Sequence, residues 1–399
     1  MKRLTILVGM VLVAALLFGC TMDDVSKILK EVQDVIEDSN GDTEDKDFEG
    51  LESDEFMDGE GSDGDEIDGE NSEDEETPEG LGNSAEEESD TGQLNIKDYF
   101  PMKGNIRYIY DGEGNEYAPF ESYVDYVEGN KMQQRIENGG AIVARIIELK
   151  DGKVTRLSTI PNASHRENFL DTEDTEKDVL LMEPLAVGTS WTLEDGSGSV
   201  REIIGIDVDV ETPAGDFKAI EVLTEGEGNK IYDYYAKDIG LIKTVFIVDD
   251  YEVMSILREI QEDTPLIQEV KFYYPDVDNN TIAFESKELK FRTNDDINDA
   301  FEEAYKDLPN QGLPVVFTEN TKINSLKVDE DGIVHLDLNA SFADEVEGGA
   351  RYEGMLLESI AKTFGHYCDA QRIALTIDGG IYETGSILLE EGDYIEISN

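Results

Sequence analysis

The sequence is poor in basic residues and in cysteine, and each shortage excludes a class of protein. Its 399 residues include 32 Lys and Arg against 93 Asp and Glu, which gives a net charge of −61. Nucleic-acid binding needs clusters of basic side chains for the phosphates. The chain has no basic run, so we expect no nucleic-acid partner and no charge-driven adhesion to anionic membranes. Two cysteines cannot form a disulfide-rich scaffold.

The N-terminus has the pattern of a secretion signal. Two basic residues precede an apolar run over 4–18, which is shorter than the ~20 residues that span a bilayer. The run ends in Leu17-Phe18-Gly19-Cys20, which resembles the lipobox of bacterial lipoproteins, although Phe18 is bulkier than the usual residue. The resemblance implies that a signal peptide, residues 1–19, is removed and that Cys20 is lipidated. The mature chain would then be held on the extracytoplasmic face of the cell membrane. The alternative is an ordinary cleaved signal that happens to contain a cysteine.

An acidic segment follows the predicted anchor. Within residues 20–37, apolar side chains recur every three or four positions, which predicts a short amphipathic helix. Residues 38–93 should form a disordered tether, because residues 47–90 contain 21 Asp or Glu and no Lys or Arg. Alternating acidic and amide residues from Asp38 resemble the start of a calcium loop. Thr43 stands where that loop requires glycine, so we expect no specific cation site.

The composition changes at Leu94, and residues 94–262 are expected to form an antiparallel β-rich domain. Short runs with alternating apolar residues are separated by turn dipeptides such as Asp151-Gly152. So many hairpin-connected strands must curl, which predicts a curved sheet or a partly closed barrel. The ten expected strands are Asn105–Tyr110, Phe120–Val127, Lys131–Ile136, Ala141–Leu149, Lys153–Thr159, Val200–Val210, Phe217–Thr224, Lys230–Tyr235, Leu241–Val248 and Glu252–Glu259.

Parts of this region resemble β-rich modules that are common in lipoproteins of Gram-positive bacteria. The resemblance lies in Pro184–Trp191, in Thr212–Phe217, in Tyr234-Tyr235-Ala236 and in Ile239–Lys243. It implies a curved antiparallel sheet and no assigned chemistry. Aromatic residues here are expected to be core or cross-strand pairs. The alternative is that some line a ligand cavity, for which the candidates are Tyr99, Phe100, Tyr108, Tyr110, Tyr117 and Trp191.

Residues 265–399 alternate between strand and helix patterns, which predicts an α/β domain. One helix is expected to start at a capping box formed by Thr293 and Asp296 and to end before Pro309. A second has its apolar face between Tyr352 and Phe364. The expected strands are Leu266–Tyr274, Lys287–Arg292, Lys322–Val328, Ile333–Leu338, Arg372–Ile377 and Tyr394–Ile397.

This region resembles the GerMN domain of sporulation and germination proteins. The matching patches are Val270–Pro275, Thr321–Val328, Val334–Asn339 with Phe342, Leu356–Phe364 and Ile377–Gly380, and their order and spacing agree with the family. A departure at Phe364–Asp369 leaves the local detail open. The resemblance implies an extracytoplasmic, ring-building-like α/β module that packs side by side in envelope complexes. The family has no established catalytic residues, so none are assigned here.

The sequence offers little catalytic chemistry. His335 should point outward from a strand, and His165 is expected at the surface. His366 and Cys368 could form half of a metal site or a Cys–His dyad. The favoured interpretation is a capped helix end with an inert thiol. We therefore predict no catalytic, cofactor-binding or metal-ligating residue. A hydrolase is the least favoured alternative, because it would need a convergent acid–base site in one cleft.

Two functions remain. The first is a non-enzymatic lipoprotein of the Gram-positive cell envelope that presents both domains to sporulation or other envelope proteins, with peptidoglycan as a further partner. The second is a ligand-binding lipoprotein whose curved sheet holds a lipid, a peptide or a peptidoglycan fragment. A cavity inside the β-rich domain would favour the second function, and a filled interior would exclude it.

Overall fold

A computed structural model describes residues 94–397, apart from 227, 308 and 310–311. The predictions for Cys20, for the amphipathic helix and for the acidic tether lie outside the described residues. The residues from Leu94 onward belong to one compact unit. We call Arg107–Gln261 the β region and Leu266–Ile397 the C-terminal region.

The β region is one antiparallel sheet of twelve strands in the order β6-β5-β4-β3-β2-β1-β12-β11-β10-β9-β8-β7. The chain forms two meanders of consecutive strands, and the pairing of β1 with β12 joins them. All ten expected strands are present, and β6 and β7 were not predicted. The bounds are β1 (Arg107–Glu113), β2 (Phe120–Glu128), β3 (Lys131–Glu137), β4 (Ile142–Lys150), β5 (Lys153–Ile160), β6 (Asp178–Met182), β7 (Ser190–Thr192), β8 (Val200–Thr212), β9 (Gly215–Gly226), β10 (Asn229–Ala236), β11 (Gly240–Val248) and β12 (Tyr251–Gln261).

The turns follow from the residues that accept left-handed backbone. Asp151 and Gly152, which join β4 to β5, have φ values of 51° and 70°. Positive φ at both central residues gives the two-residue turn whose twist matches the flanking strands. The predicted Asp-Gly hairpin is thus confirmed.

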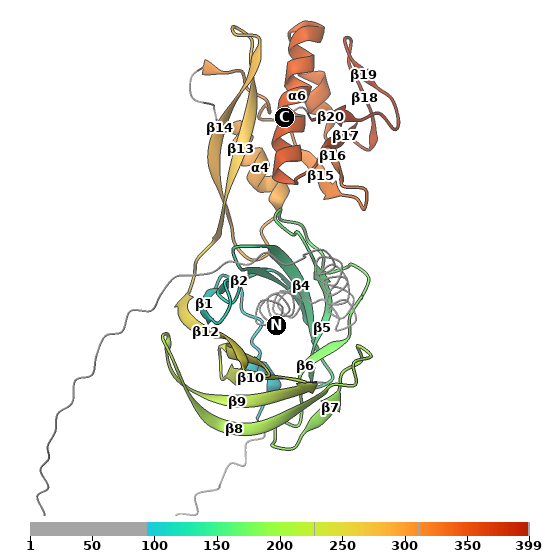
Figure 1. Cartoon of the computed structure of the whole chain (residues 1–399). Helices are drawn as coiled ribbons and strands as arrows, with labels where there is room; N and C mark the ends of the chain where they lie inside the picture. The colour runs from blue at the N-terminus through green and yellow to red at the C-terminus, as the bar shows by residue number, and fades with distance from the viewer. Residues whose placement is uncertain (1–93, 227, 308, 310–311, 398–399) are drawn as a thin grey trace, which may run out of the picture. The chain divides into compact units, whose positions relative to one another are not determined.

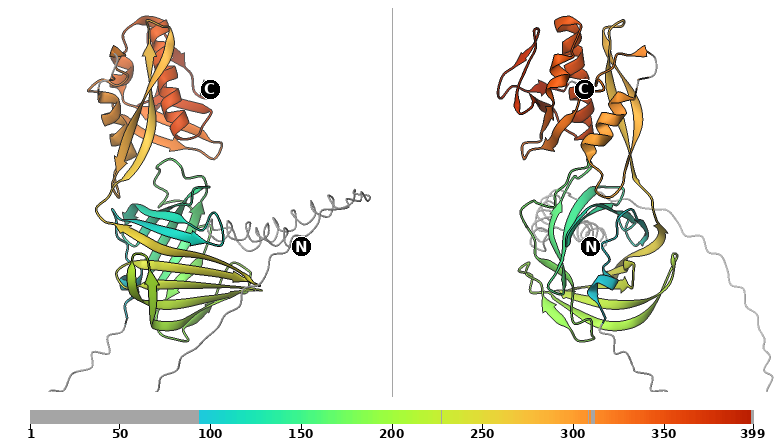
Figure 2. Two further views of the ribbon diagram at one scale, coloured as in Figure 1. Left: turned by 60° about the vertical axis from the view of Figure 1, so that its left-hand side comes forward. Right: turned by 180° about the vertical axis from the view of Figure 1, so that it is seen from behind.

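The sheet curls until its two edge strands approach each other, and the two meanders face each other across the interior (Figures 1 and 2). Among the described residues no backbone ladder joins β6 to β7. Side chains close this gap instead. Trp191 Nε1 of β7 donates to the carbonyl of Val179 of β6 at 2.9 Å, and Arg201 of β8, the neighbour of β7, pairs with Asp178 of β6 at 2.9 Å. We call this contact the seam. The prediction of a curved sheet is confirmed, and the sheet is not a closed barrel.

Two of the apolar clusters that pack against this sheet line its interior. One contains residues of both meanders, such as Met132 and Ile220, together with Ile96 and Tyr99 of the short helix α3 (Ile96–Tyr99). The other is built around Phe120, Ile136 and Leu257, and around the stacked rings of Tyr110 and Phe120. The β region therefore has its own core, and that core is divided.

The C-terminal region combines a long hairpin, helices and a mixed sheet. Its sheet has the order β15-β16-β17-β18-β19, and β20 also pairs with β17. Helix α6 lies between the β13–β14 hairpin and this sheet (Figure 1) and connects the parallel strands β16 and β17. The bounds are β13 (Leu266–Asp276), β14 (Thr281–Phe291), α4 (Ile297–Lys306), β15 (Ile323–Val328), β16 (Ile333–Leu338), α5 (Ala340–Asp344), α6 (Gly349–Tyr367), β17 (Arg372–Ile377), β18 (Gly380–Glu383), β19 (Leu388–Leu389) and β20 (Ile395–Glu396).

The predicted capping box at the start of α4 is wrong. The N-cap is Asp296, whose carboxylate accepts from the backbone N–H of Asn298. Thr293 serves the β region instead: its Oγ1 donates to the carbonyl of Val124 at 2.7 Å and accepts from the N–H of Asn105 at 2.8 Å. Local spacing could not reveal these partners because both are more than a hundred residues away in the chain.

Candidate functional site

The curled sheet encloses a cavity of about 210 Å³. Alternate residues of its strands face this space, such as Ile231, Asp233 and Tyr235 of β10, because successive strand side chains point to opposite faces. Both apolar clusters contribute to the wall, for example through Met132 and Ile136. The interior of the β region is therefore hollow where the two clusters meet.

One wall of the cavity is charged. Five charged side chains of the lining interact with one another: Arg145, Arg156, Arg201, Asp178 and Asp233. Lys103 also lines the cavity, apart from this group. Asp178 accepts from Arg201 Nη1 at 2.9 Å and from Arg156 Nη2 at 3.0 Å. Arg156 also pairs with Glu176 at 2.7 Å. These ion pairs bridge β5, β6 and β8, so this wall continues into the seam.

The pKa values in this wall reflect burial and neighbouring charge. Burial raises the pKa of Asp233, which accepts from Thr244 Oγ1 at 2.7 Å. Burial also acts to raise the pKa of Asp178, but Arg201 and Arg156 outweigh it and the net shift is downward. Burial, with the adjacent Arg156, lowers the pKa of Arg145 to about 10. Arg145 therefore remains cationic at neutral pH.

The cavity reaches the surface beside Lys103, which is exposed and also lines it. Lys103 Nζ donates to the carbonyl of Asp238 at 2.7 Å. This bond links the segment that follows α3 to the turn between β10 and β11. Pro101 and Ile239 lie on the same two segments and also line the cavity.

Half of the aromatic candidates line the cavity. Phe100, Tyr108 and Tyr110 do so. Tyr99, Tyr117 and Trp191 do not line it, and Trp191 belongs to the seam. The charged wall was not predicted. The sequence did contain one sign of it, a charged residue on the apolar face of an expected strand, as at Arg145 within Ala141–Leu149. Only the fold shows that such residues from different strands lie together.

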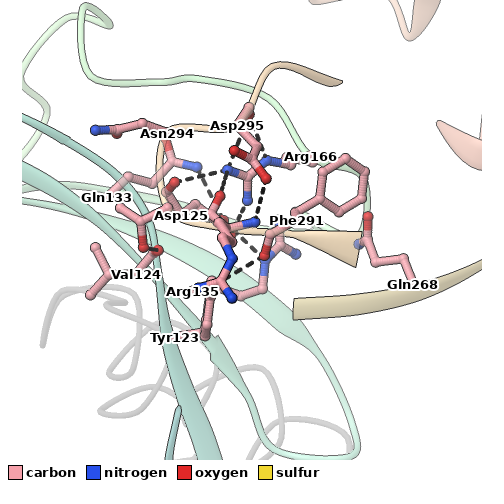
Figure 3. A network of polar contacts seen from close by, with 12 residues as sticks. Tyr123, Val124, Asp125, Gln133, Arg135, Arg166, Gln268, Phe291, Asn294 and Asp295 are labelled. Atoms are coloured by element: carbon pink, nitrogen blue, oxygen red, sulfur yellow. Dashed lines mark hydrogen bonds and ion pairs between the residues drawn. The ribbon is translucent and has the colours of Figure 1, made fainter. Parts of the chain in front are cut away.

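A second polar cluster joins the β region to the C-terminal region (Figure 3). Asp125 of β2 is fully buried and accepts from Arg135 Nε and from Arg166 Nη1, both at 3.0 Å. Arg166 lies on the loop between β5 and β6, and its Nη2 donates to the carbonyls of Asp125 and Arg292, each at 2.9 Å. Its guanidinium also stacks over Phe291 of β14, 5.0 Å from the ring centroid. We call this cluster the junction.

Neutral hydrogen bonds surround the junction. Tyr123 OH contacts the carbonyls of Thr264 and Phe291 at 3.2 and 3.1 Å. Tyr367 OH of α6 accepts from the N–H of Arg166 at 2.9 Å and donates to Gln268 at 2.8 Å. Buried charges are stable only when they are paired and hydrogen-bonded, and here the acceptors come from both regions.

The histidines and the described cysteine form no shared site. His335 is exposed, as predicted, and bonds to Asp329 at 2.7 Å. His366 Nδ1 lies 2.9 Å from Tyr273 OH. Cys368 is the buried C-cap of α6, and burial raises the pKa of its thiol, so the thiol stays protonated. The expectation of a surface His165 is wrong: its side chain is 13% exposed and bonds to Glu167 beside the junction.

Residues 94–397, leaving aside the gaps, lack two further features. In that part of the chain, no three His, Cys, Asp or Glu side chains are placed to hold a metal ion. No helix there is long and apolar enough to cross a membrane.

Comparison with known proteins assigns the C-terminal region. The family model Germane, described as sporulation and spore germination, matches residues 271–383. The GerMN domain predicted from the sequence is therefore confirmed. The match covers less than half of the chain, so it assigns this region and not the whole protein. No curated protein matches the chain.

Solved structures give weaker likenesses. A protein of YmcC-like fold from Bacteroides fragilis NCTC 9343, provisionally described as exported, is 14% identical with a TM-score of 0.26 and covers 41% of this chain and 99% of its own. The first GerMN domain of the sporulation protein GerM from Bacillus subtilis is 15% identical with a TM-score of 0.24, covering 33% and 97%. The tandem GerMN domains of that protein are 21% identical with a TM-score of 0.25, covering 34% and 46%. With TM-scores of 0.26 or less, these likenesses carry no inference about function.

Proposed function

We propose that this chain is a lipid-anchored protein of the bacterial cell envelope that acts by assembling with other envelope proteins and not by catalysis. The observation that carries the proposal is the family-model match over residues 271–383. The family description also supports a more specific proposal, namely that this envelope role belongs to sporulation or germination. The lipobox-like Leu17–Cys20 supports extracytoplasmic anchoring.

The junction supports the presentation of both regions together. Arg166 donates to acceptors in each region, and Thr293 and Tyr123 add hydrogen bonds across the same boundary. If the two regions separated, Arg166, Thr293 and Tyr123 would each lose a hydrogen-bond partner. We infer that partners meet the β region together with the GerMN domain.

Anchoring is tested by the substitution Cys20→Ala. Lipidation requires the cysteine thiol, so the variant should be released into the medium or remain unprocessed. Membrane fractionation and the mass of the N-terminal peptide distinguish these products from the parent. Normal processing with unchanged membrane fractionation would contradict the lipoprotein proposal.

Assembly is tested by cross-linking in intact cells, followed by capture of the chain. We expect envelope proteins to be recovered with the parent chain and to be lost with Cys20→Ala, because the released variant no longer shares their location. Recovery of the same proteins from both would show contact after lysis. Recovery of no envelope protein from the parent would overturn the proposal.

A second candidate function is ligand binding by the β region, and the cavity is the observation that favours it. An apolar cavity with a few convergent polar groups is the usual form of a small-molecule site. This function is compatible with the first, because the cavity and the GerMN domain use different residues.

A further inference from the structure

We propose that the cavity binds a small anionic amphiphile, which consists of one carboxylate on a short apolar body. This inference rests on the second candidate function and names its ligand class. The carboxylate would lie against the charged wall, and the apolar body would lie against side chains such as Phe100, Ile231 and Phe246.

The sign of the charge in the cavity points to an anion. The chain has 93 acidic and 32 basic residues, but the cavity lining has four basic residues, of which Lys103 lies at the opening, and two acidic ones. One further carboxylate, Glu176, pairs with Arg156 from outside the lining. Charge–charge attraction is much stronger inside a protein than in water. A guanidinium also matches the planar oxygens of a carboxylate through paired hydrogen bonds. The cavity would therefore attract anions, which the acidic outer surface of the protein repels.

Closing the seam does not account for the whole charged wall. The seam needs Asp178 of β6, to which Arg156 of β5 and Arg201 of β8 both donate. Arg145 of β4 and Asp233 of β10 lie on strands away from the sheet edges, yet both face the same space. A merely structural cluster would also be packed without a void, because protein interiors are normally close-packed.

The apolar part of the lining and the volume define the rest of the ligand. Aromatic and aliphatic side chains of both apolar clusters make up the rest of the cavity lining. The cavity of about 210 Å³ is somewhat larger than a cavity of ~150 Å³ that holds one benzene molecule. This favours a short acyl or aryl body over a long acyl chain. Lys103, exposed at the opening, would meet the anion first.

The test is calorimetric titration of the full chain carrying Cys20→Ala with octanoate, octanol and octylammonium. Octanoate should bind, and octanol should bind at least about tenfold more weakly because it lacks the charge. Octylammonium should not bind. In Arg145→Gln the affinity for octanoate should fall about tenfold, while that for octanol should not change.

A cavity-filling variant separates this site from binding elsewhere in the chain. Ile231→Trp places a bulkier side chain in the cavity and should abolish octanoate binding while the protein stays folded. Tyr232→Trp, the next residue and on the opposite face of β10, should bind octanoate like the parent. If Ile231→Trp binds octanoate as tightly as the parent does, the proposed site is wrong.

The outcomes also separate this inference from the function on which it rests. If octanol binds as tightly as octanoate and Ile231→Trp abolishes both, the cavity binds ligands but the anionic class is wrong. If no compound binds the parent chain, both the inference and the second candidate function fail.

Discussion

Carboxylates that each hold two arginines occur twice in the described part of this molecule, one fully buried and one partly buried. Asp178 pairs with Arg156 and Arg201 at the seam, and Asp125 pairs with Arg135 and Arg166 at the junction. Removing the carboxylate leaves two guanidiniums in a poorly solvated place, which costs more than the pair contributes to stability. Both positions should therefore be sensitive to a change that hardly alters side-chain shape.

Asp178→Asn tests this at the residue scale. We expect it to lower the free energy of unfolding at pH 7 by about 3 kcal/mol. The pKa of Asp178 is lowered in the folded state, so its contribution is present above the unfolded pKa of about 3.9 and is lost as the pH falls through the folded value. The difference between parent and variant should therefore shrink in acid. Denaturant unfolding between pH 7 and pH 3 measures it.

Asp209→Asn is the matched control. Asp209 pairs with Lys218 at 2.6 Å, but its side chain is 82% exposed. Exposed pairs contribute less than about 1 kcal/mol, so this variant should unfold like the parent. An equal loss in both variants would show that general charge, and not the buried pair, determines the effect.

At the scale of elements, the seam determines how the sheet ends. An edge strand exposes unpaired backbone groups, and natural sheets protect these edges. Here β6 and the three-residue β7 are held by Trp191, Arg201 and their acceptors instead of by a ladder. The edge strands should open more readily than β1 and β12, which have neighbours on both sides.

Trp191→Phe tests the seam. It keeps an aromatic ring but removes the donor to Val179, which should cost about 1 kcal/mol. Hydrogen exchange measured by mass spectrometry should become faster in β6 and β7 and stay unchanged in β1. As a control, Tyr251→Phe removes a bond from β12 to Gly114 and should not affect β6 or β7. Faster exchange throughout the sheet would instead indicate a global loss of stability.

At the scale of the whole molecule, the junction connects two regions that each have their own core. Few hydrophobic side chains cross between them, and Tyr123 is the residue of the β region that belongs to the C-terminal cluster. Polar bonds through Arg166 therefore carry much of the connection. Cooperative unfolding of the two regions should depend on this residue.

Arg166→Met tests that dependence. It keeps a long apolar side chain but leaves Asp125 without one of its two arginines. We expect calorimetry to show two separate unfolding transitions and limited proteolysis to cut between β12 and β13. Arg292→Met removes an exposed pair with Asp263 at the same boundary and should leave a single transition, as in the parent. A single transition in Arg166→Met would show that other contacts couple the regions.

Much of the fold could be predicted because it depends on local pattern. Alternation and turn dipeptides placed ten strands, and helical spacing placed α4 and α6. The errors arise where long-range partners decide. Thr293 bonds to Val124 rather than capping a helix, and β7 is a strand only because β8 lies beside it. The candidate site was predicted in part, through Phe100, Tyr108 and Tyr110, because aromatic residues are conspicuous in a sequence.

The sequence by itself determined the excess of acidic residues, the lipobox-like start, the β-rich composition and the GerMN pattern, because these are properties of neighbouring residues. Only the tertiary structure decided that Arg145, Arg201 and Asp233 share one cavity wall and that Arg166 joins two regions. The physical reason is that the sheet brings strands far apart in sequence to one interior. A charge within an apolar run shows its role only when its partners are in place.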